Sequence, residues 1–455
     1  MSTTAKVSFG TVPQANQPTA APKPDAPFRI AVLADFSGRQ GRGEIGSPDE
    51  IAGRRLLRIS RDSFDDVMSK LGAQLEVPVG DDGATAALGF GSLDDFHPDQ
   101  LHDTVEPIAD ASDSDDKSAL MNSVLHQPAL QALEASWRGV YWLLGRVKSG
   151  PVEVVLLDIS LAELSADLTA SENLATSGLF RLLVEKAIDG PRSQPCALLV
   201  GDYVFEPTAE HVALLGRLAK IAARASAAFL TTLHPNVLDK GFAWPSDAAS
   251  AWQALRQLPE AKRMGVAVPR FLLRPPYGEN TQSIDKFSYE EMSTPPDRAH
   301  YLWGNPAFAC AALLAQTFQK QGWAAKPGAD LDLENLTMHV YTADDEQEVT
   351  LGEAWLVRPQ SEQLVKQGIM PLLCVRDKNA MQLVRFLSIA QPPANQPPCN
   401  LEGPWSASGT APAAPTAARC GRNCRTPRWR RCPRGARRSG WSGPRWRRCV
   451  AAPRR

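Results

Sequence analysis

Short apolar runs alternate with amphipathic segments along most of this 455-residue chain. Phe28–Ala34 and Val152–Asp158 are continuous apolar runs, which is typical of buried strands. The segment that begins at Pro128 differs, because its apolar residues recur at helical spacing. We therefore predict a long amphipathic helix there, with a stripe of Leu130, Leu133, Trp137, Val140, Tyr141, Leu144 and Val147.

Residues 28–105 have the pattern of a small N-terminal α/β unit. The strand Phe28–Ala34 is followed by Ser63–Leu71, whose apolar positions fall on one helical face. Two further apolar runs, Leu75–Val79 and Ala86–Phe90, flank a Gly-Asp-Asp-Gly turn, which predicts a hairpin.

Residues 118–402 have the pattern of a larger domain in which strands and helices alternate. Ser160 and Glu163 form a capping box that opens one of these helices. The alternation predicts the α/β fold class, with a layered domain around a central mixed sheet. The expected strands after Val152–Asp158 are Cys196–Val200, Ala227–Leu233, Met264–Val268, Met338–Tyr341 and Leu372–Val375, and the expected helices are Thr208–Ser226, Ala307–Gln321 and Ser361–Gln367.

Three segments differ in composition from these two units. Residues 1–27 are rich in Pro, Ala, Thr and Gln, which predicts a disordered leader. Residues 106–117 are acidic and Ser-rich, which is typical of a linker. Residues 403–455 consist mainly of Ala, Pro, Arg, Gly, Cys and Trp and predict a basic, low-complexity tail. Such a tail is either disordered or the product of a GC-rich gene read out of frame; the alternative is a genuine tail that binds an acidic surface.

The net charge of −1 is the average of two unlike parts. After Glu402 there are 14 Arg and no Asp, Glu or Lys. Residues 1–402 therefore contain 35 of the 49 basic residues and all 50 acidic residues, so this part of the chain is acidic. An acidic body repels phosphates, which argues against nucleic acid as a partner. No apolar run approaches the ~20 residues of a membrane span, and the N-terminus lacks the apolar stretch of a secretory signal. We therefore expect a cytoplasmic protein without membrane insertion.

The cysteines give no metal site. Cys196, Cys310 and Cys374 lie far apart in apolar contexts, which predicts reduced core thiols. The tail contains four more cysteines, namely Cys420, Cys424, Cys432 and Cys449. The first two fit one C-x₂₋₄-C unit, but the last two form no second unit and no His lies nearby, so a zinc site is not expected.

The loop Gly38–Gly46 is the nearest approach to a phosphate cradle, because it follows a strand. It lacks the Lys-Ser/Thr of a Walker loop and the G-x-G-x-x-G of a dinucleotide site. A surface loop is the favoured interpretation, and no cofactor is expected.

No catalytic constellation stands out. Asp202 is expected just past a strand end, where α/β enzymes place catalytic groups, but no His or Cys companion is identifiable. The acidic pairs are adjacent in sequence and are expected on the solvated surface; they are Asp65-Asp66, Asp94-Asp95, Asp115-Asp116 and Asp344-Asp345. Arg270 and Arg274 are expected to form ion pairs, either within the chain or with a neighbour. A core or subunit interface is the expected place for the large aromatic residues Trp137, Tyr141, Trp142, Trp303 and Trp323.

Several longer strings resemble the large subunit of the type VI secretion contractile sheath, the TssC or VipB family. They are ASWRGVYWLL (Ala135–Leu144), LLVGDYVF (Leu198–Phe205), VPRFLLRPPYG (Val268–Gly278) and YLWGNPAFACAALLAQTFQKQGW (Tyr301–Trp323). A second set resembles the small subunit, TssB or VipA: FRIAVLADFSG (Phe28–Gly38), RDSFDDVMSKL (Arg61–Leu71) and GFGSLDDFHPD (Gly89–Asp99). The order implies a fused sheath protomer, with residues 106–117 as the joint.

The resemblance implies a mechanical function and no catalytic, cofactor-binding or metal residues. Sheath protomers polymerise as helical rings around an inner tube of hemolysin-coregulated protein, on a baseplate, and contract to propel the tube. A ClpV-type AAA+ unfoldase is a further implied partner. In the family, however, the large subunit continues beyond the region that resembles Phe386–Ala390, and the segment gripped by the unfoldase has no residue-by-residue match here. An incomplete or non-polymerising paralogue is therefore the alternative, and an α/β enzyme that uses Asp202 is a distant one.

Overall fold

The computed structural model describes residues 7–13, 22–80, 83–147, 150–188, 194–239, 244–343 and 346–409. The chain divides into two units, Met1–Gly409 and Thr410–Arg455. The second unit lies outside the described residues, and so do residues 1–6 and 14–21 of the predicted leader. What the sequence predicts for those segments stays a prediction.

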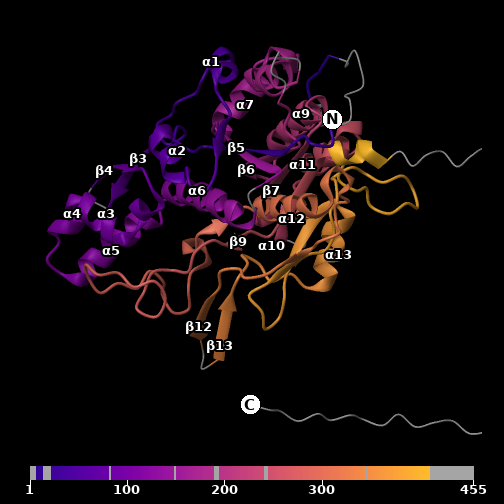
Figure 1. The fold of residues 1–455 in the computed structure, drawn as a ribbon. Helices are drawn as coiled ribbons and strands as arrows, with labels where there is room; N and C mark the ends of the chain where they lie inside the picture. The colour runs from indigo at the N-terminus through magenta and orange to yellow at the C-terminus, as the bar shows by residue number, and fades with distance from the viewer. Residues whose placement is uncertain are drawn as a thin grey trace, which may run out of the picture. The chain divides into compact units, whose positions relative to one another are not determined.

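A nine-stranded sheet forms the centre of the first unit (Figure 1). Its strand order is β11-β15-β14-β8-β7-β6-β1-β5-β2. The six strands from β14 to β5 are parallel, whereas β2 and β15 run antiparallel to their neighbours. The strands are β1 (Phe28–Ala34), β2 (Leu57–Ile59), β5 (Val152–Asp158), β6 (Leu198–Phe205), β7 (Ala228–Leu233), β8 (Met264–Val268), β11 (Asp332–Leu333), β14 (Ile369–Cys374) and β15 (Met381–Leu383).

The N-terminal segment supplies a central strand of this sheet. All seven residues of β1 are buried, and it pairs with β5 from Phe28↔Val152 to Ala34↔Asp158. On its other side β1 pairs with β6 from Ile30↔Leu198 onward. A parallel strand covered on both faces needs apolar residues throughout, which explains the continuous run in this part of the sequence.

Helices cover both faces of the sheet, so the predicted α/β fold class is confirmed. On one face, even-numbered β1 residues such as Ile30 and Val32 share a core with α6 (Pro128–Arg146) and α12 (Pro306–Gln321). On the other, Ala31 and Leu33 pack with α7 (Leu161–Thr169), α9 (Ala209–Arg224) and α11 (Ser246–Arg256). None of the helices within the described ranges has the length and apolar character needed to cross a membrane.

The remaining helices are short. They are α1 (Pro48–Gly53), α2 (Phe64–Leu71), α3 (Pro98–Thr104), α4 (Glu106–Asp110), α5 (Ser114–Leu125), α8 (Gly178–Phe180), α10 (Asn236–Asp239) and α13 (Arg358–Lys366). Three two-stranded sheets accompany them: β3 (Ala73–Val79) with β4 (Ala84–Phe90), β9 (Phe271–Leu272) with β10 (Trp303–Gly304), and β12 (His339–Ala343) with β13 (Glu346–Thr350). The β3–β4 pair is the predicted hairpin.

The predicted long helix is α6, and it begins at Pro128 as expected. Its Trp137 is fully buried and donates a hydrogen bond from Nε1 to the Phe36 carbonyl oxygen at 2.9 Å. A Cβ at Gly139 would lie 2.4 Å from the Phe308 ring of α12, so only glycine permits this close approach of the two helices.

Two segments are more ordered than the composition suggests. Residues 106–117, the expected linker, contain α4 and the start of α5, where the Asp113 side chain accepts a hydrogen bond from the Asp115 amide. Acidic residues favour helix N-termini, because they complement the helix dipole and the free amides there. Within the expected leader, Val7–Pro13 lies on the body, and Thr11 pairs with Asn173. Apolar Val7 and Phe9 pack against the core beside α9.

The strand expected at Met338–Tyr341 exists as β12, but it lies outside the large sheet and pairs only with β13 among the described residues. The pattern of β12 shows why: its residues are half-buried or exposed, whereas β14 has four consecutive buried residues. The helix expected at Ser361–Gln367 is observed as α13.

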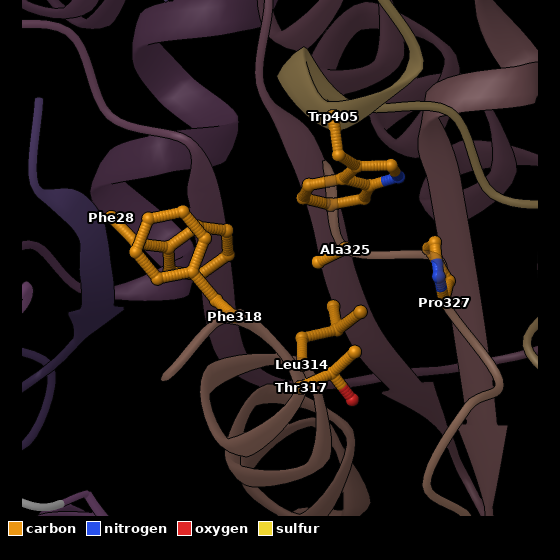
Figure 2. Close-up of a pocket in the computed structure, with 7 residues that line it drawn as sticks. All are labelled: Phe28, Leu314, Thr317, Phe318, Ala325, Pro327 and Trp405. Carbon is orange, nitrogen blue, oxygen red and sulfur yellow. The ribbon is translucent and has the colours of Figure 1, made fainter. Parts of the chain in front are cut away.

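The first residues of the predicted tail belong to the body. Pro404–Gly409 forms a short 3₁₀ helix, and the Trp405 ring stacks on Phe28 of β1 with 6.0 Å between ring centroids. Figure 2 shows Trp405 at one side of a small apolar pocket, with Leu314 and Thr317 of α12 opposite. The pocket has an interior volume of about 10 Å³, room for one water molecule at most. It is a packing defect rather than a ligand site.

Trp405→Ala is expected to lower the free energy of unfolding by about 3–5 kcal/mol, because it removes a buried aromatic ring that packs on the first residue of β1. Trp355→Ala is the matched control, since 52% of Trp355 is exposed, and it should change stability by less than about 0.5 kcal/mol. Urea denaturation of the full chain measures both. Equal effects of the two substitutions would contradict this account of Trp405.

Candidate functional site

The carboxyl ends of β1 and β5 hold a cluster of charged residues that joins the N-terminal segment to the rest of the chain. We call Asp35, Arg39, Arg54, Asp158 and Glu163 the seam cluster. The first three precede α2, and the other two lie in or after β5. Because β1 and β5 are parallel neighbours, their carboxyl ends meet at the same edge of the sheet.

Glu163 is the centre of the seam cluster, and its side chain has no exposed surface. Arg54 donates to Glu163 Oε1 at 2.6 Å, and Arg39 Nε donates to the same oxygen at 3.0 Å. Burial would raise the pKa of Glu163, but the Arg54 hydrogen bond and the amides of Ser160 and Gly46 lower it to about 2. The carboxylate is therefore ionised and paired at neutral pH.

Asp158 fastens the turn that follows β1. It accepts hydrogen bonds from the Phe36 and Ser37 amides at 2.8 and 3.1 Å and from the Ser37 hydroxyl at 2.7 Å. Burial nevertheless raises the pKa of Asp158. Asp35 accepts from the Arg39 and Gln40 amides at 2.7 and 2.9 Å.

These contacts decide the role of the loop Gly38–Gly46. A phosphate cradle needs free amides, yet the amides of Arg39, Gln40 and Gly46 donate to carboxylates of the protein. The surrounding acidic groups would also repel a phosphate. The arrangement supports the interpretation as a surface loop, and it gives that loop a structural role: it carries Arg39 to Glu163.

A second buried network lies between α6 and the segment after β9. Arg274 donates to Glu134 at 2.9 Å and to both oxygens of Glu291 at 2.7 and 3.0 Å. Burial would lower the pKa of Arg274, but the two carboxylates raise it well above its usual range. Burial likewise opposes ionisation of Glu291, whose pKa Arg274 lowers to about 2. The predicted ion pair of Arg274 is thus within the chain, as is that of Arg270 with Glu353.

Asp202 lies inside β6 and not past its end, so the expected position is corrected. The strand continues to Phe205 because Val204 and Phe205 pair with β7 after an irregularity in the register. Asp202 is hydrogen-bonded to Ser136 and Asn305, and burial raises its pKa to about 6. Asp202 is half-buried, and these two contacts hold its carboxyl group in place on β6. Among the residues that the structure describes, no group of three or more His, Cys, Asp or Glu side chains could hold a metal ion.

The large aromatic residues belong mainly to the core. Trp137 and Trp303 are buried, and Trp323 packs against Phe318 at 4.9 Å between ring centroids. Tyr141 is the exception, with 42% of its surface exposed. Of the acidic pairs, Asp344-Asp345 lies outside the described residues, and each of the others has at least one exposed member.

The cysteines in apolar contexts are free thiols. Cys196 and Cys310 are buried, and burial raises the pKa of each to about 12. Thiols with such pKa values stay protonated and unreactive. The four tail cysteines lie outside the described residues.

Sequence reasoning missed the most connected charged groups. It identified Glu163 only as the end of a capping box, which the structure contains. It did not single out Glu134, although this residue lies next to Leu133 in the apolar stripe of α6. A carboxylate within an apolar face is a usable signal, but its partner Arg274 is 140 positions away and could not be identified from spacing.

Glu163→Gln is expected to lower the free energy of unfolding by about 3–5 kcal/mol at pH 7, because Arg39 and Arg54 lose their shared carboxylate. The depressed pKa stabilises the wild type above pH 4.5, and this contribution is lost as the pH falls toward 2. The difference between variant and wild type should therefore shrink over that window. The control is Glu44→Gln, since Glu44 is 42% exposed beside Arg39. A pH-independent difference would contradict the assignment.

Asp202→Asn should show the opposite pH dependence. The pKa of Asp202 is raised from 3.8 to about 6, so the wild type loses stability as the pH rises through that window, whereas the variant does not titrate. Urea denaturation between pH 4 and 8 should show the variant gaining on the wild type up to about pH 6 and a constant difference above it. No gain across this range would mean that Asp202 titrates normally.

Two family matches cover most of the body. Residues 114–389 match the VipB family, described as "EvpB/VC_A0108, tail sheath N-terminal domain". Residues 15–132 match a family described as "Type VI secretion system, VipA, VC_A0107 or Hcp2". The resemblance to both sheath subunits is confirmed. By these ranges, Asp35, Arg39 and Arg54 of the seam cluster belong to the VipA-like segment, and Asp158 and Glu163 belong to the VipB-like segment. The seam cluster therefore joins the two segments.

One relative in sequence and one solved structure are similar to this chain. The type VI secretion system sheath protein TssC1 of Pseudomonas aeruginosa is 29% identical over 315 residues, which are 64% of this chain and 62% of the relative. The chain thus spans less than two thirds of that relative's length. A solved structure, the cryo-EM structure of the anti-feeding prophage baseplate, aligns with 88% of this chain and 72% of its own at 12% identity. Its TM-score of 0.38 is too low to support an argument. On the two family matches, the chain belongs to the sheath proteins of the type VI secretion system, with a TssB-like part and a TssC-like part on one polypeptide.

Proposed function

We propose that this chain is a structural protomer of the contractile sheath, which polymerises around the inner tube and contracts to propel it. The observation that carries the proposal is the position of β1. This strand comes from the VipA-like segment and pairs on both sides with strands of the VipB-like segment. The two parts therefore make one folding unit, as a fused protomer requires.

A protomer of this kind must be stiff enough to transmit force. The seam cluster ties the VipA-like segment to the VipB-like segment with buried ion pairs, and the Arg274 network does the same between two parts of the VipB-like segment. Buried pairs of this kind break only at a high cost. Contraction then consists of two arrangements of intact protomers, separated by a modest free energy that is multiplied over many copies. Fusion also fixes the one-to-one ratio of the two parts.

The proposed partners are other sheath protomers, the hemolysin-coregulated inner tube, the baseplate and a ClpV-type unfoldase, and the proposed location is the cytoplasm. The proposed role is mechanical rather than enzymatic. Asp202 supports this, because its hydrogen bonds to Ser136 and Asn305 hold it within the sheet.

The second candidate is a sheath paralogue that binds the apparatus without polymerising. The family matches support it equally, because they establish membership of the sheath proteins and not polymerisation.

Negative-stain electron microscopy of the full chain, expressed with the inner-tube protein, separates the two candidates. A sheath protomer should form long tubules with a regular helical repeat. The control is Trp405→Ala or Glu163→Gln, whichever remains folded at the assay temperature, since a weakened protomer should form fewer or shorter tubules. Soluble single copies of the wild type at every protein and salt concentration would overturn the first candidate and favour the second.

A further inference from the structure

Two histidine rings from distant parts of the chain stack on each other. His126 caps the C-terminus of α5, and His300 ends the short 3₁₀ turn Arg298–His300, which leads into β10. The ring centroids are 3.8 Å apart, and the rings are parallel to within 3°. Two parallel stacked rings cannot both point a nitrogen lone pair at one ion, so the pair is not a metal site.

The stack holds the turn Arg298–His300 on the corner between α5 and α6. Gln131 of α6 adds two long hydrogen bonds from its side-chain amide to the Ala299 and His300 carbonyl oxygens, both at 3.4 Å. Residue 126 lies in the range that both family matches share, residues 114–132, whereas residue 300 lies in the VipB match alone. The stack therefore fastens the joint between the two parts to a later segment of the VipB-like part.

Glu291 is the carboxylate nearest to His126. The two face each other with 3.8 Å between His126 Nε2 and Glu291 Oε1, which is too long for a hydrogen bond, and the His126 side chain is only 12% exposed. Among the described residues, this nitrogen has no hydrogen-bond partner. Arg274 already donates to both oxygens of Glu291. Glu291 can therefore balance one proton on the pair, but it shares its charge with Arg274.

The charged groups on the other neighbouring elements are paired or exposed. Glu134 of α6 accepts hydrogen bonds from Arg138 and Arg274. Arg298 donates to the Glu353 carbonyl oxygen at 2.6 Å, and His339 of β12 is hydrogen-bonded to the Tyr301 hydroxyl at 2.7 Å. Asp297 favours a proton on His300, but it is exposed, so solvent screens its charge.

A second proton on the pair meets strong repulsion. It would place positive charges on two half-buried rings whose centroids are 3.8 Å apart. Burial lowers the pKa of His300, and the neighbouring His126 lowers it further, whereas Asp297 and Glu291 act in the opposite direction. The stacked arrangement thus favours a pair that carries at most one proton.

We propose that His126 and His300 form a pH-sensitive latch, which holds the turn Arg298–His300 on the α5–α6 corner and releases it when both rings are protonated. The proposal goes beyond the proposed function and does not depend on it. Because the pKa of His300 is lowered from 6.5, the stack stabilises the fold above that pH, and this contribution is lost as the pH falls. The release is local, since Trp303 Nε1 donates to the Arg298 carbonyl oxygen at 2.8 Å on the far side of the turn.

Hydrogen–deuterium exchange of the full chain at pH 7.5 and 5.5 locates the release. The Ala299 and His300 amides both donate to Asp297 in the closed turn, so their protection reports on its order. After correction for intrinsic exchange, peptides that cover residues 297–303 should lose protection by about tenfold or more at pH 5.5. His300→Phe retains an aromatic ring that cannot be protonated, so this variant should keep its protection at both pH values. Equal protection of the wild type at the two pH values would overturn the latch.

A double-mutant cycle tests whether the two rings act together. The free energy of unfolding is measured in urea at pH 7.5 and 5.5 for His126→Phe, His300→Phe and the double variant. Each single substitution should remove the loss of stability that the pair causes at pH 5.5, and the double variant should remove no more, because one neutral ring abolishes the repulsion. Additive effects of the two substitutions would overturn the proposal. If a Phe variant does not fold, the corresponding Gln variant replaces it.

Two further histidines provide the controls. His234→Gln changes a side chain that is 31% exposed beside Glu206, and it should leave the pH dependence of the turn unchanged. His339→Gln removes the neighbouring histidine, whose pKa burial also lowers, and the turn should still open at pH 5.5. A turn that stays protected at pH 5.5 in this variant would assign the response to His339 and overturn the latch of His126 and His300.

Discussion

The position of β1 is the constraint on which the rest of this structure depends. A seven-residue strand buried on both faces and paired on both edges cannot be removed without opening the sheet between β5 and β6. Each segment alone would expose apolar surface and unpaired backbone groups, which is costly in water and invites association through the open edge. The VipA-like and VipB-like parts are therefore halves of one core.

The buried charges follow from this architecture. Parallel strands bring their carboxyl ends to one edge, and there Asp158 and Glu163 meet arginines of the N-terminal segment. A buried ion pair adds little net stability compared with apolar packing, but it tolerates little displacement, because a charge left without its partner is strongly unfavourable. The seam cluster thus fixes the register between segments that apolar contacts alone would hold less specifically. The Arg274 network does the same for α6 and the irregular segment that follows β9.

Local patterns identified most elements but not their partners. The strand Val152–Asp158, the helix at Pro128 and the β3–β4 hairpin could be predicted because each has a periodicity of its own. The insertion of β1 beside β5 could not, since the order of strands in a parallel sheet leaves no trace in spacing. Composition misled where a short polar stretch is ordered by a helix cap, as at Asp113, or by a tertiary contact, as at Thr11. Asp202 shows the same limit: a bulge in the pairing of β6 carries the strand beyond the apolar run.

The chain order of the central strands also has a consequence for biosynthesis. Arg29 of β1 pairs with Glu153 of β5, 124 positions later, and β6 is more distant still. During translation β1 therefore leaves the ribosome long before either neighbour exists, as an apolar strand with both edges open. Contacts of such large sequence separation form slowly. If the two parts were separate chains, β1 would stay exposed until it met its partner chain, at a rate that depends on concentration. On one polypeptide the partner strands are tethered to β1, so the time for which β1 is exposed is limited by the rate of synthesis.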